Sequence, residues 1–259
     1  EVLRLIKVCE KVRDKAIISL LRDSGGRIEE AILRPKIKDV LIDDYGARLS
    51  VDGKTGHRNI RLIDSVPYLQ EWLNKHPHND NPNSPLFISL KHTFGEVLKY
   101  NGVISMLNRV KKFAGITKRV NPHGFRHSAV TDDTLKGLNE AELRIRHGWK
   151  PNSRMPSRYT HIIEKQVDDK ILRIAGKLKA DDEDKLQEEN KILQPKKCVR
   201  CGKINFPEAK YCNCGMALDL KQVMEDTGKR EHYDDKMNEL FADAEFRDLL
   251  KGYLKKKAT

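Results

Sequence analysis

The first quarter of the chain combines one helical pattern with three short strand-like patterns. Apolar side chains recur at the spacing of an amphipathic helix over residues 2–22, and the sequence "DSGGR" then ends the pattern. Three stretches after it, "KDVLIDD" (38–44), "ARLSVDG" (47–53) and "HRNIRLI" (57–63), are typical of short strands and are separated by the turn sequences "YG" and "KTG". We therefore expect a helix followed by a small antiparallel sheet of three strands.

Helical periodicity dominates from Asp64 onward. The expected helices span residues 64–76, 92–114, 121–136, 139–147 and 163–179, with a loop rich in Asn and Pro at 77–85. The polar stretch "ADDEDKLQEENKILQP" (180–195) predicts either an exposed helix or a flexible linker. Residues 219–257 predict one or two amphipathic helices. The fold class is therefore α+β and mainly α, with one small antiparallel sheet.

The organisation along the chain follows from these patterns and from the size of the protein. The chain has 259 residues, of which 38% are apolar, which is enough for one good-sized core and smaller appendages. We expect a main domain at 1–179, a polar linker at 180–195, a cysteine-rich module at 196–218 and a helical tail at 219–259. Because the chain begins without methionine and enters directly into a helical pattern, we also expect that an N-terminal portion is missing.

No apolar run approaches the roughly 20 residues that a membrane span needs. The first residues, "EVLRLIKVCEKVRDK", carry too many charges for a secretory signal. The sequence thus predicts a cytoplasmic protein without a membrane partner.

The positive charge is confined to the expected main domain. Residues 1–179 hold 34 Lys and Arg against 21 Asp and Glu, whereas residues 180–259 hold 16 against 17. A field of this sign attracts polyanions, among which nucleic acid is the commonest in a cytoplasm. A basic but merely solvated surface is the alternative.

Four of the five cysteines form a cluster, "CVRCGKINFPEAKYCNCG". The spacing of Cys198, Cys201, Cys212 and Cys214 resembles that of a zinc ribbon, although its second pair is one residue shorter than the usual C-x2-C. Gly202 and Gly215 each follow the second Cys of a pair, where a tight turn favours a residue without Cβ. Four protein ligands leave no open coordination position, so we expect a structural zinc; incidental reduced thiols are the alternative.

The stretch "NPHGFRHSAVTDDTL" (121–135) predicts the start of a helix, with Asn121 as N-cap and Pro122 at the first helical position. A cation such as Arg126 is unfavourable at that positive end unless an anion docks there, and a phosphate suits a guanidinium best. Pairing of Arg126 with Asp132 or Asp133 is the alternative. His123 and His127 have the spacing of a metal-binding pair, but the glutamate of H-E-x-x-H is missing, so we do not expect a metal there.

Five segments in order, "LLRDSGGRIEEAILRPKIKDV", "GKTGHRNIRL", "HGFRHSAVT", "RHGWKPNS" and "SRYTHI", resemble the tyrosine recombinase (phage integrase) family over roughly residues 10–178. The resemblance is greatest to archaeal members. It implies a helical catalytic domain with a three-stranded sheet that cuts and rejoins DNA without a catalytic cofactor.

Transferred position by position, the resemblance implies a set of site residues. These are Arg27, Lys54 in the "KTG" turn, His123, Arg126, Trp149 and the nucleophile Tyr159 as catalytic residues, with Glu30 as their acidic companion. His147 competes with Trp149 for its position, since G-W is a minority variant. The gap from Trp149 to Tyr159 is also one residue longer than usual.

The implied reaction forms a 3′-phosphotyrosyl link and releases a 5′-hydroxyl. Arg27 and Arg126 would neutralise the phosphate, His123 would accept the tyrosine proton, and Lys54 would protonate the leaving oxygen. The partners would be double-stranded DNA and three further copies of the chain in a tetramer. A DNA-binding protein without turnover and a type IB topoisomerase remain as alternatives.

Overall fold

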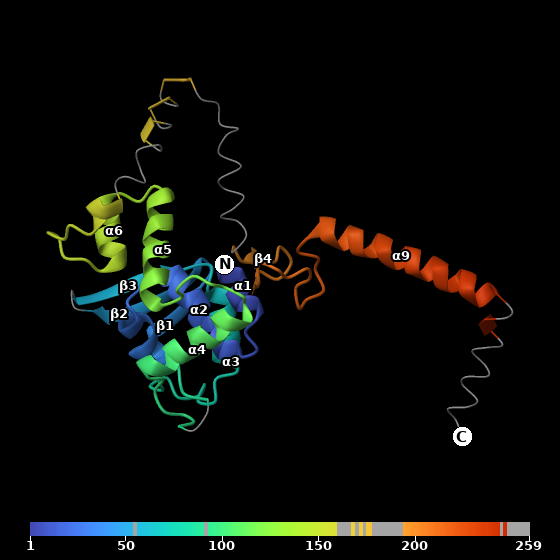
Figure 1. Ribbon diagram of the computed structural model, residues 1–259, viewed down its shortest axis with the longest axis horizontal. Helices are drawn as coiled ribbons and strands as arrows, with labels where there is room; N and C mark the ends of the chain where they lie inside the picture. The colour runs from blue at the N-terminus through green and yellow to red at the C-terminus, as the bar shows by residue number, and fades with distance from the viewer. Residues whose placement is uncertain are drawn as a thin grey trace. The chain divides into compact units, whose positions relative to one another are not determined.

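The computed structural model describes residues 1–53, 56–90, 93–159, 167–168, 171–172, 175–177, 194–243 and 246–247. It divides the chain into two units, Glu1–Pro195 and Lys196–Thr259 (Figure 1). Within the described residues, no helix is both long and apolar enough to cross a lipid bilayer.

The first unit is built around one buried helix. Helix α1 spans Val2–Lys7 and helix α2 spans Val12–Ser24, and residues 16–21 of α2 are all buried because apolar residues face the layers on either side. Helix α2 contacts α1, α3 (Val66–Asn74), α5 (Pro122–Leu135) and strand β3 (Gly56–Leu62). The core of the unit therefore surrounds α2.

The expectation of one helix over 2–22 was wrong, since residues 8–11 interrupt it. Lys11 has an extended backbone and begins α2, whereas Val8 ends α1. Both halves keep the helical period and both bury apolar side chains, including Leu5 and Ile17. A period alone does not show a change of axis, and no Pro or Gly marks this one.

The expected sheet is present and has the order β1-β2-β3, with antiparallel pairing throughout. Strand β1 spans Val40–Asp43, β2 spans Gly46–Gly53 and β3 spans Gly56–Leu62. Between α2 and the sheet lie a single π-helical turn, η1 (Glu29–Leu33), and a 3-10 turn, η2 (Ile37–Asp39). The register pairs Gly53 with Gly56, so residues 54 and 55 connect the two strands.

The helix expected at 92–114 begins later, as α4 (Tyr100–Phe113). The segment before it pairs with itself: Ser89 N–H donates to Glu96 O at 2.8 Å and Leu98 N–H donates to Phe87 O at 3.1 Å. Gly95 has a φ of +85° within this turn, a conformation that excludes continuation of a helix. Backbone pairing of the loop therefore replaces the first turns of the expected helix.

The next two helices match their expected positions. Helix α5 spans Pro122–Leu135 with Asn121 as its cap, and α6 spans Glu140–His147 and ends at Gly148 with a φ of +62°. The turn η3 (Pro156–Tyr159) then carries the tyrosine. Most of the expected helix 163–179 and of the expected linker 180–195 lies outside the described residues.

The described residues of the second unit form a two-stranded sheet and one long helix. Strand β4 (Lys196–Lys197) pairs antiparallel with β5 (Ile204–Asn205), and helix α9 spans Leu220–Ala242. The end of the tail expected at 219–259 lies beyond the described residues.

Candidate active site

Arg27 stands where α2 turns toward the sheet. Helix α2 ends at Gly25, whose φ of +53° reverses the chain direction, and Arg27 follows two residues later. Its guanidinium Nη1 contacts Glu30 Oε1 at 2.7 Å, and the side chain is 39% exposed. The charge of Arg27 is therefore held in place from one side and accessible from the other.

Arg126 comes from the first turns of α5. Asn121 caps this helix by accepting a hydrogen bond from the N–H of Gly124 at 2.7 Å, which fixes where the helix begins. Arg126 is buried, and its Nη1 and Nη2 donate to the carbonyls of Gly25 at 2.9 Å and His147 at 2.7 Å. One guanidinium thus ties the end of α2 to the end of α6.

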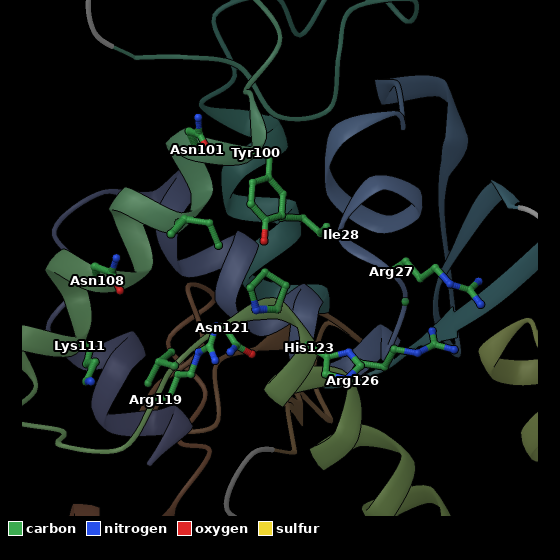
Figure 2. Close-up of a pocket in the computed structure, with 14 residues that line it drawn as sticks. Arg27, Ile28, Tyr100, Asn101, Asn108, Lys111, Arg119, Asn121, His123 and Arg126 are labelled. Atoms are coloured by element: carbon green, nitrogen blue, oxygen red, sulfur yellow. The ribbon is translucent and has the colours of Figure 1, made fainter. Parts of the chain in front are cut away.

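The two guanidiniums meet at the end of α6. Arg126 donates to the carbonyl of His147, and Arg27 approaches the next carbonyl, that of Gly148, at 3.4 Å. Figure 2 shows both side chains extending in the same direction. Burial, together with the charge of Arg27, lowers the pKa of Arg126 to about 10, so Arg126 stays cationic at neutral pH.

Arg126 has no partner among the acidic residues of its own helix. Asp132 pairs with Arg22, and Asp133 pairs with Arg146 and His147. The alternative of a surface ion pair for Arg126 is therefore wrong.

Glu30 joins Arg27 to a second arginine that the sequence analysis missed. Glu30 is 4% exposed, with Oε1 on Arg27 and Oε2 on Nη2 of Arg58 at 2.8 Å. Burial alone raises the pKa of the Glu30 carboxyl, but hydrogen bonds from Arg58 and Arg27 outweigh burial and hold it below the usual value. The signal for Arg58 was its alternation with Ile60 and Leu62, which places all three on the buried face of β3.

We expect the Glu30→Gln variant to lose about 1–3 kcal/mol of unfolding free energy at pH 7, because two guanidiniums lose their buried counter-ion. Since the folded-state pKa lies below the unfolded-state value, the wild-type advantage is complete at pH 7. It disappears as the pH falls through the folded-state pKa. Urea unfolding at pH 7 and at successively lower pH measures both effects.

The matched control is Glu29→Gln. Glu29 pairs with Arg34 and both side chains are more than half exposed, so its loss should change stability by less than about 1 kcal/mol. Equal effects of the two variants at pH 7 would contradict the structural importance of Glu30.

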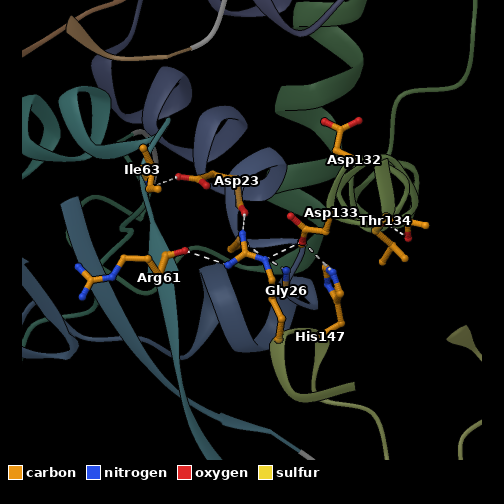
Figure 3. A network of polar contacts seen from close by, with 12 residues as sticks. Asp23, Gly26, Arg61, Ile63, Asp132, Asp133, Thr134 and His147 are labelled. Atoms are coloured by element: carbon orange, nitrogen blue, oxygen red, sulfur yellow. Dashed lines mark hydrogen bonds and ion pairs between the residues drawn. The ribbon is translucent and has the colours of Figure 1, made fainter. Parts of the chain in front are cut away.

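A polar network lies beneath the arginine pair. Asp133 Oδ2 accepts from Nε of Arg146 at 2.6 Å and lies 3.0 Å from Nε2 of His147, and Arg146 also donates to the carbonyl of Asp23 at 3.0 Å. Figure 3 shows Asp23, Asp133 and His147 of this network. The network fixes the backbone at residues 146–147, whose carbonyl in turn holds Arg126.

The side chains of His147 and Trp149 face different neighbours. The His147 ring is completely buried and faces Asp133, whereas the Trp149 ring lies 5.5 Å from Cζ of Arg126 and borders a cleft with Arg27 and Arg126. Of the two residues, Trp149 is the one that faces the arginine pair.

Tyr159 is buried against Trp149. Its ring stacks on Trp149 with centroids 6.4 Å apart and packs in an apolar cluster with Val130 and Leu143. Its hydroxyl lies 2.5 Å from Nδ1 of His127, and Nε2 of His127 lies 2.8 Å from Nε2 of His123. The partner of the tyrosine hydroxyl is therefore His127 and not His123.

The environment sets opposite protonation tendencies for the two contacting groups. Burial raises the pKa of Tyr159, with Arg126 and Arg158 opposing it, so the hydroxyl keeps its proton at neutral pH. Burial, His123 and Arg126 all lower the pKa of His127, so its imidazole is neutral there. A protonated phenol thus faces a neutral base.

The sequence does not reveal the contact of His127 with the tyrosine, because a spacing of four residues from His123 is also that of a metal-binding pair. The same spacing of four residues also places it on the helix face of His123, one turn further along, where the tyrosine reaches it.

Two clefts open beside these residues. One, of about 550 Å³, is lined by Arg27, His123, Arg126 and Trp149, and the other, of about 520 Å³, shares the first three and extends along α4 past Tyr100 and Asn108 (Figure 2). Lys54 lies outside the described residues. Gly53, at the end of β2, lies so close to Glu30 that a Cβ on Gly53 would be 2.6 Å from Oε1 of Glu30.

The four clustered cysteines lie close together in the second unit. Their sulfur atoms all lie within 4.8 Å of one another, with Cys198 and Cys214 3.6 Å apart and Cys201 and Cys212 3.5 Å apart. Gly202 and Gly215 have φ values of +72° and +84°, as the two turns require. Four thiolates about 2.3 Å from one zinc ion are about 3.8 Å apart, so the four side chains fit such an ion.

Comparison with known proteins shows the family of this chain. The sequence profile of the phage integrase family matches residues 1–166, which is more than half of the protein. The chain belongs to the phage integrase family. The family resemblance expected from the five ordered motifs is confirmed.

Individual relatives are moderately similar. A tyrosine recombinase of Synechococcus elongatus is 33% identical over 124 residues, covering 46% of this chain and 38% of that protein. Tyrosine recombinase XerA of Saccharolobus solfataricus is 27% identical over 163 residues, covering 63% of this chain and 50% of that protein. The chain thus spans about half, or less, of the length of these curated relatives. The narrower expectation of an archaeal-type member stays a prediction.

Solved structures confirm the fold. The crystal structure of XerA recombinase matches with a TM-score of 0.55 and 24% identity over 66% of this chain and 60% of that one. XerH site-specific recombinase, bound to its difH substrate in a pre-cleavage complex, matches with a TM-score of 0.53 and 23% identity over 64% and 49% of the two chains. The expected mainly helical catalytic-domain fold with a three-stranded sheet is therefore correct.

Proposed function

We propose that this protein is a tyrosine-type site-specific DNA recombinase that cuts and rejoins DNA strands through a 3′-phosphotyrosyl intermediate. The observation that carries the proposal is the convergence of Arg27, Arg126 and Trp149 on one cleft, with the Tyr159 ring packed directly behind Trp149. Relatives that match the same region are named tyrosine recombinases.

The proposed roles follow from the contacts. Arg27 and Arg126 neutralise the charge that grows on the non-bridging oxygens as the phosphorus becomes five-coordinate. Trp149 packs on Arg126 and offers its indole N–H to the phosphate, and Glu30 positions Arg27. Lys54, which follows Gly53 in the sequence, protonates the leaving 5′-oxygen. Bond energy is conserved in the phosphotyrosyl link, so catalysis needs no cofactor.

Double-stranded DNA is the proposed substrate, and a homotetramer is the proposed assembly on it. The excess of Lys and Arg within residues 1–179 supports DNA as the partner. Among structural neighbours, XerH is bound to its difH substrate.

A suicide substrate tests the proposal. A DNA duplex nicked close to the cleavage site loses the short strand after attack, which traps the covalent intermediate. We expect a protein–DNA adduct that survives denaturation, and mass spectrometry of its peptides should place the nucleotide remnant on Tyr159. Relaxation of supercoiled plasmid without exchange between two DNA sites would favour a topoisomerase, and an adduct-free protein that binds DNA would contradict catalysis altogether.

We also propose that Cys198, Cys201, Cys212 and Cys214 hold a structural zinc ion. Their sulfur positions support this assignment, because all four atoms lie within 4.8 Å of one another. With four protein ligands the ion would stabilise the fold of residues 196–218 and take no part in cleavage.

Metal removal should unfold this module and leave the first unit folded. Zinc binding to comparable small modules contributes about 10–16 kcal/mol, which is more than a two-stranded sheet supplies by itself. We expect one equivalent of zinc in the purified protein by elemental analysis, and its loss in Cys198→Ser. After chelation, limited proteolysis should cleave within 196–218 first.

The control for this experiment is Cys9→Ala. Cys9 lies in the core of the first unit, where its thiol donates a hydrogen bond to the carbonyl of Leu5. Its replacement should therefore leave the zinc content unchanged. A zinc content that does not respond to Cys198→Ser would contradict the proposed ligand set.

A further inference from the structure

A chain of two hydrogen bonds leads from the tyrosine to the cleft. The Tyr159 hydroxyl contacts Nδ1 of His127 at 2.5 Å, and Nε2 of His127 contacts Nε2 of His123 at 2.8 Å. Tyr159 is buried at one end, and His123 is exposed and borders both clefts at the other end. His127 is thus the only link between them among the contacts of the described residues.

The two contacts allow two arrangements when all three groups are neutral, with the protons directed from Tyr159 toward His123 or from His123 toward Tyr159. In the first arrangement the phenol donates to Nδ1 of His127, which leaves the one proton of that imidazole on Nε2. His127 Nε2–H then donates to Nε2 of His123, whose own proton lies on Nδ1. In this arrangement a proton can pass from Tyr159 outward without any side chain moving.

We infer that His127 is a catalytic residue that accepts the proton of Tyr159 and passes one to His123. This inference rests on the proposed function. It replaces the expectation that His123 takes the tyrosine proton directly, because His127 lies between the two groups.

The step balances in protons and bonds. The bond between the Tyr159 oxygen and phosphorus forms and the bond from phosphorus to the 5′-oxygen breaks. The phenol proton moves to Nδ1 of His127 while the Nε2 proton of His127 moves to His123, which becomes an imidazolium. The 5′-oxygen takes a proton from the general acid, for which Lys54 is proposed. Rejoining runs the same transfers backward.

The local charges explain why a relay suits this site better than a single base. An imidazolium on His127, which is half-buried, would lie close to two cations, Arg126 and Arg158. His123 is exposed, so the positive charge that it receives is hydrated and also borders the bound phosphate. Moving the charge from His127 to His123 therefore removes a repulsion from the buried part of the site.

A purely structural hydrogen bond is the alternative role for His127, and His127→Asn separates the two. The asparagine Oδ1 accepts a hydrogen bond near the position of Nδ1 but is not basic, so it can hold the tyrosine without taking its proton. In single-turnover cleavage of the suicide substrate by the full chain, we expect His127→Asn to slow adduct formation about 10²–10⁴-fold. DNA affinity and the thermal unfolding midpoint should remain close to wild type.

Two further measurements sharpen this test. His123→Ala should slow cleavage less than His127→Asn, because His127 still accepts the proton and solvent then takes it. Free imidazole should partly restore His127→Ala, which leaves a cavity, but should not restore His127→Phe, which fills it. A substrate with sulfur at the 5′ bridging position needs no acid for its leaving group, so it should restore Lys54→Ala and leave His127→Asn slow.

The possible results distinguish failure of this inference from failure of the proposed function. Cleavage by His127→Asn within about threefold of wild type would reduce His127 to a structural role and overturn the inference. A larger defect in His123→Ala than in His127→Asn, or rescue of His127→Asn by the sulfur substrate, would also overturn it. If the wild-type chain itself forms no adduct, the proposed function fails instead.

Discussion

Replacing Tyr159 by phenylalanine should abolish the covalent protein–DNA adduct. The substitution removes the only proposed nucleophile, and loss of a nucleophile reduces covalent catalysis by more than about 10⁴-fold. The phenylalanine ring keeps the stacking on Trp149 and the packing on Val130 and Leu143. Only the hydrogen bond to His127 disappears, which should cost about 0.5–1.5 kcal/mol of stability. Gel analysis of the suicide-substrate reaction after denaturation measures the adduct.

Tyr45→Phe is the matched control for this variant. Tyr45 is 81% exposed at the turn between β1 and β2, so its hydroxyl can be removed without touching the cleft. Adduct formation by Tyr45→Phe should equal that of wild type, and DNA binding by Tyr159→Phe should be nearly unchanged. An adduct of undiminished yield in Tyr159→Phe would show that another residue attacks the DNA.

Loss of Arg126 should reduce cleavage far more than binding. The transition state carries more negative charge on the phosphate than the ground state does, so a guanidinium aimed at that phosphate contributes mainly to the rate. We expect Arg126→Ala to slow adduct formation about 10²–10³-fold, the range found when one donor to a charged transition state is removed. DNA affinity should fall about tenfold or less, as expected for the loss of a single phosphate contact.

Arg126 also has a structural task, so Ala alone is not a clean test. Its guanidinium joins the carbonyls of Gly25 and His147, and both lose their donor in Arg126→Ala. Arg126→Lys keeps the positive charge but not the forked donor geometry, and it should remain at least about tenfold slower than wild type. Arg34→Ala, at an exposed ion pair, is the control for net charge. Near-normal cleavage by Arg126→Ala would show that its assigned role is wrong.

The start of α5 could be predicted from sequence because its determinants are local. Asn121 caps the helix and Pro122 occupies its first position, and both act through neighbouring backbone groups. The three strands were equally legible, since their turns are marked by Gly46 and Gly56. The interruption at residues 8–11 was not, because a change of helix direction depends on which core the two halves share.

The residues of the candidate site also fall into two groups, those that the sequence predicts and those that only the structure identifies. Arg27, Glu30 and Arg126 were found from the order of motifs, whereas Arg58 and His127 were found only from contacts. Arg58 reaches Glu30 from a strand 28 residues further along the chain, and His127 meets Tyr159 across 32 residues. No local pattern encodes such distances.

The amino-acid sequence by itself therefore determined the family, the helix boundaries set by caps and glycines, the excess of positive charge and the cysteine spacing, because each depends on residue identity or on neighbours along the chain. Only the tertiary structure decided that Trp149 and not His147 faces the arginine pair, and that His127 and not His123 meets the tyrosine. The physical reason is that burial and hydrogen bonding between distant segments select one orientation for each ring. Residue type and spacing leave those orientations open.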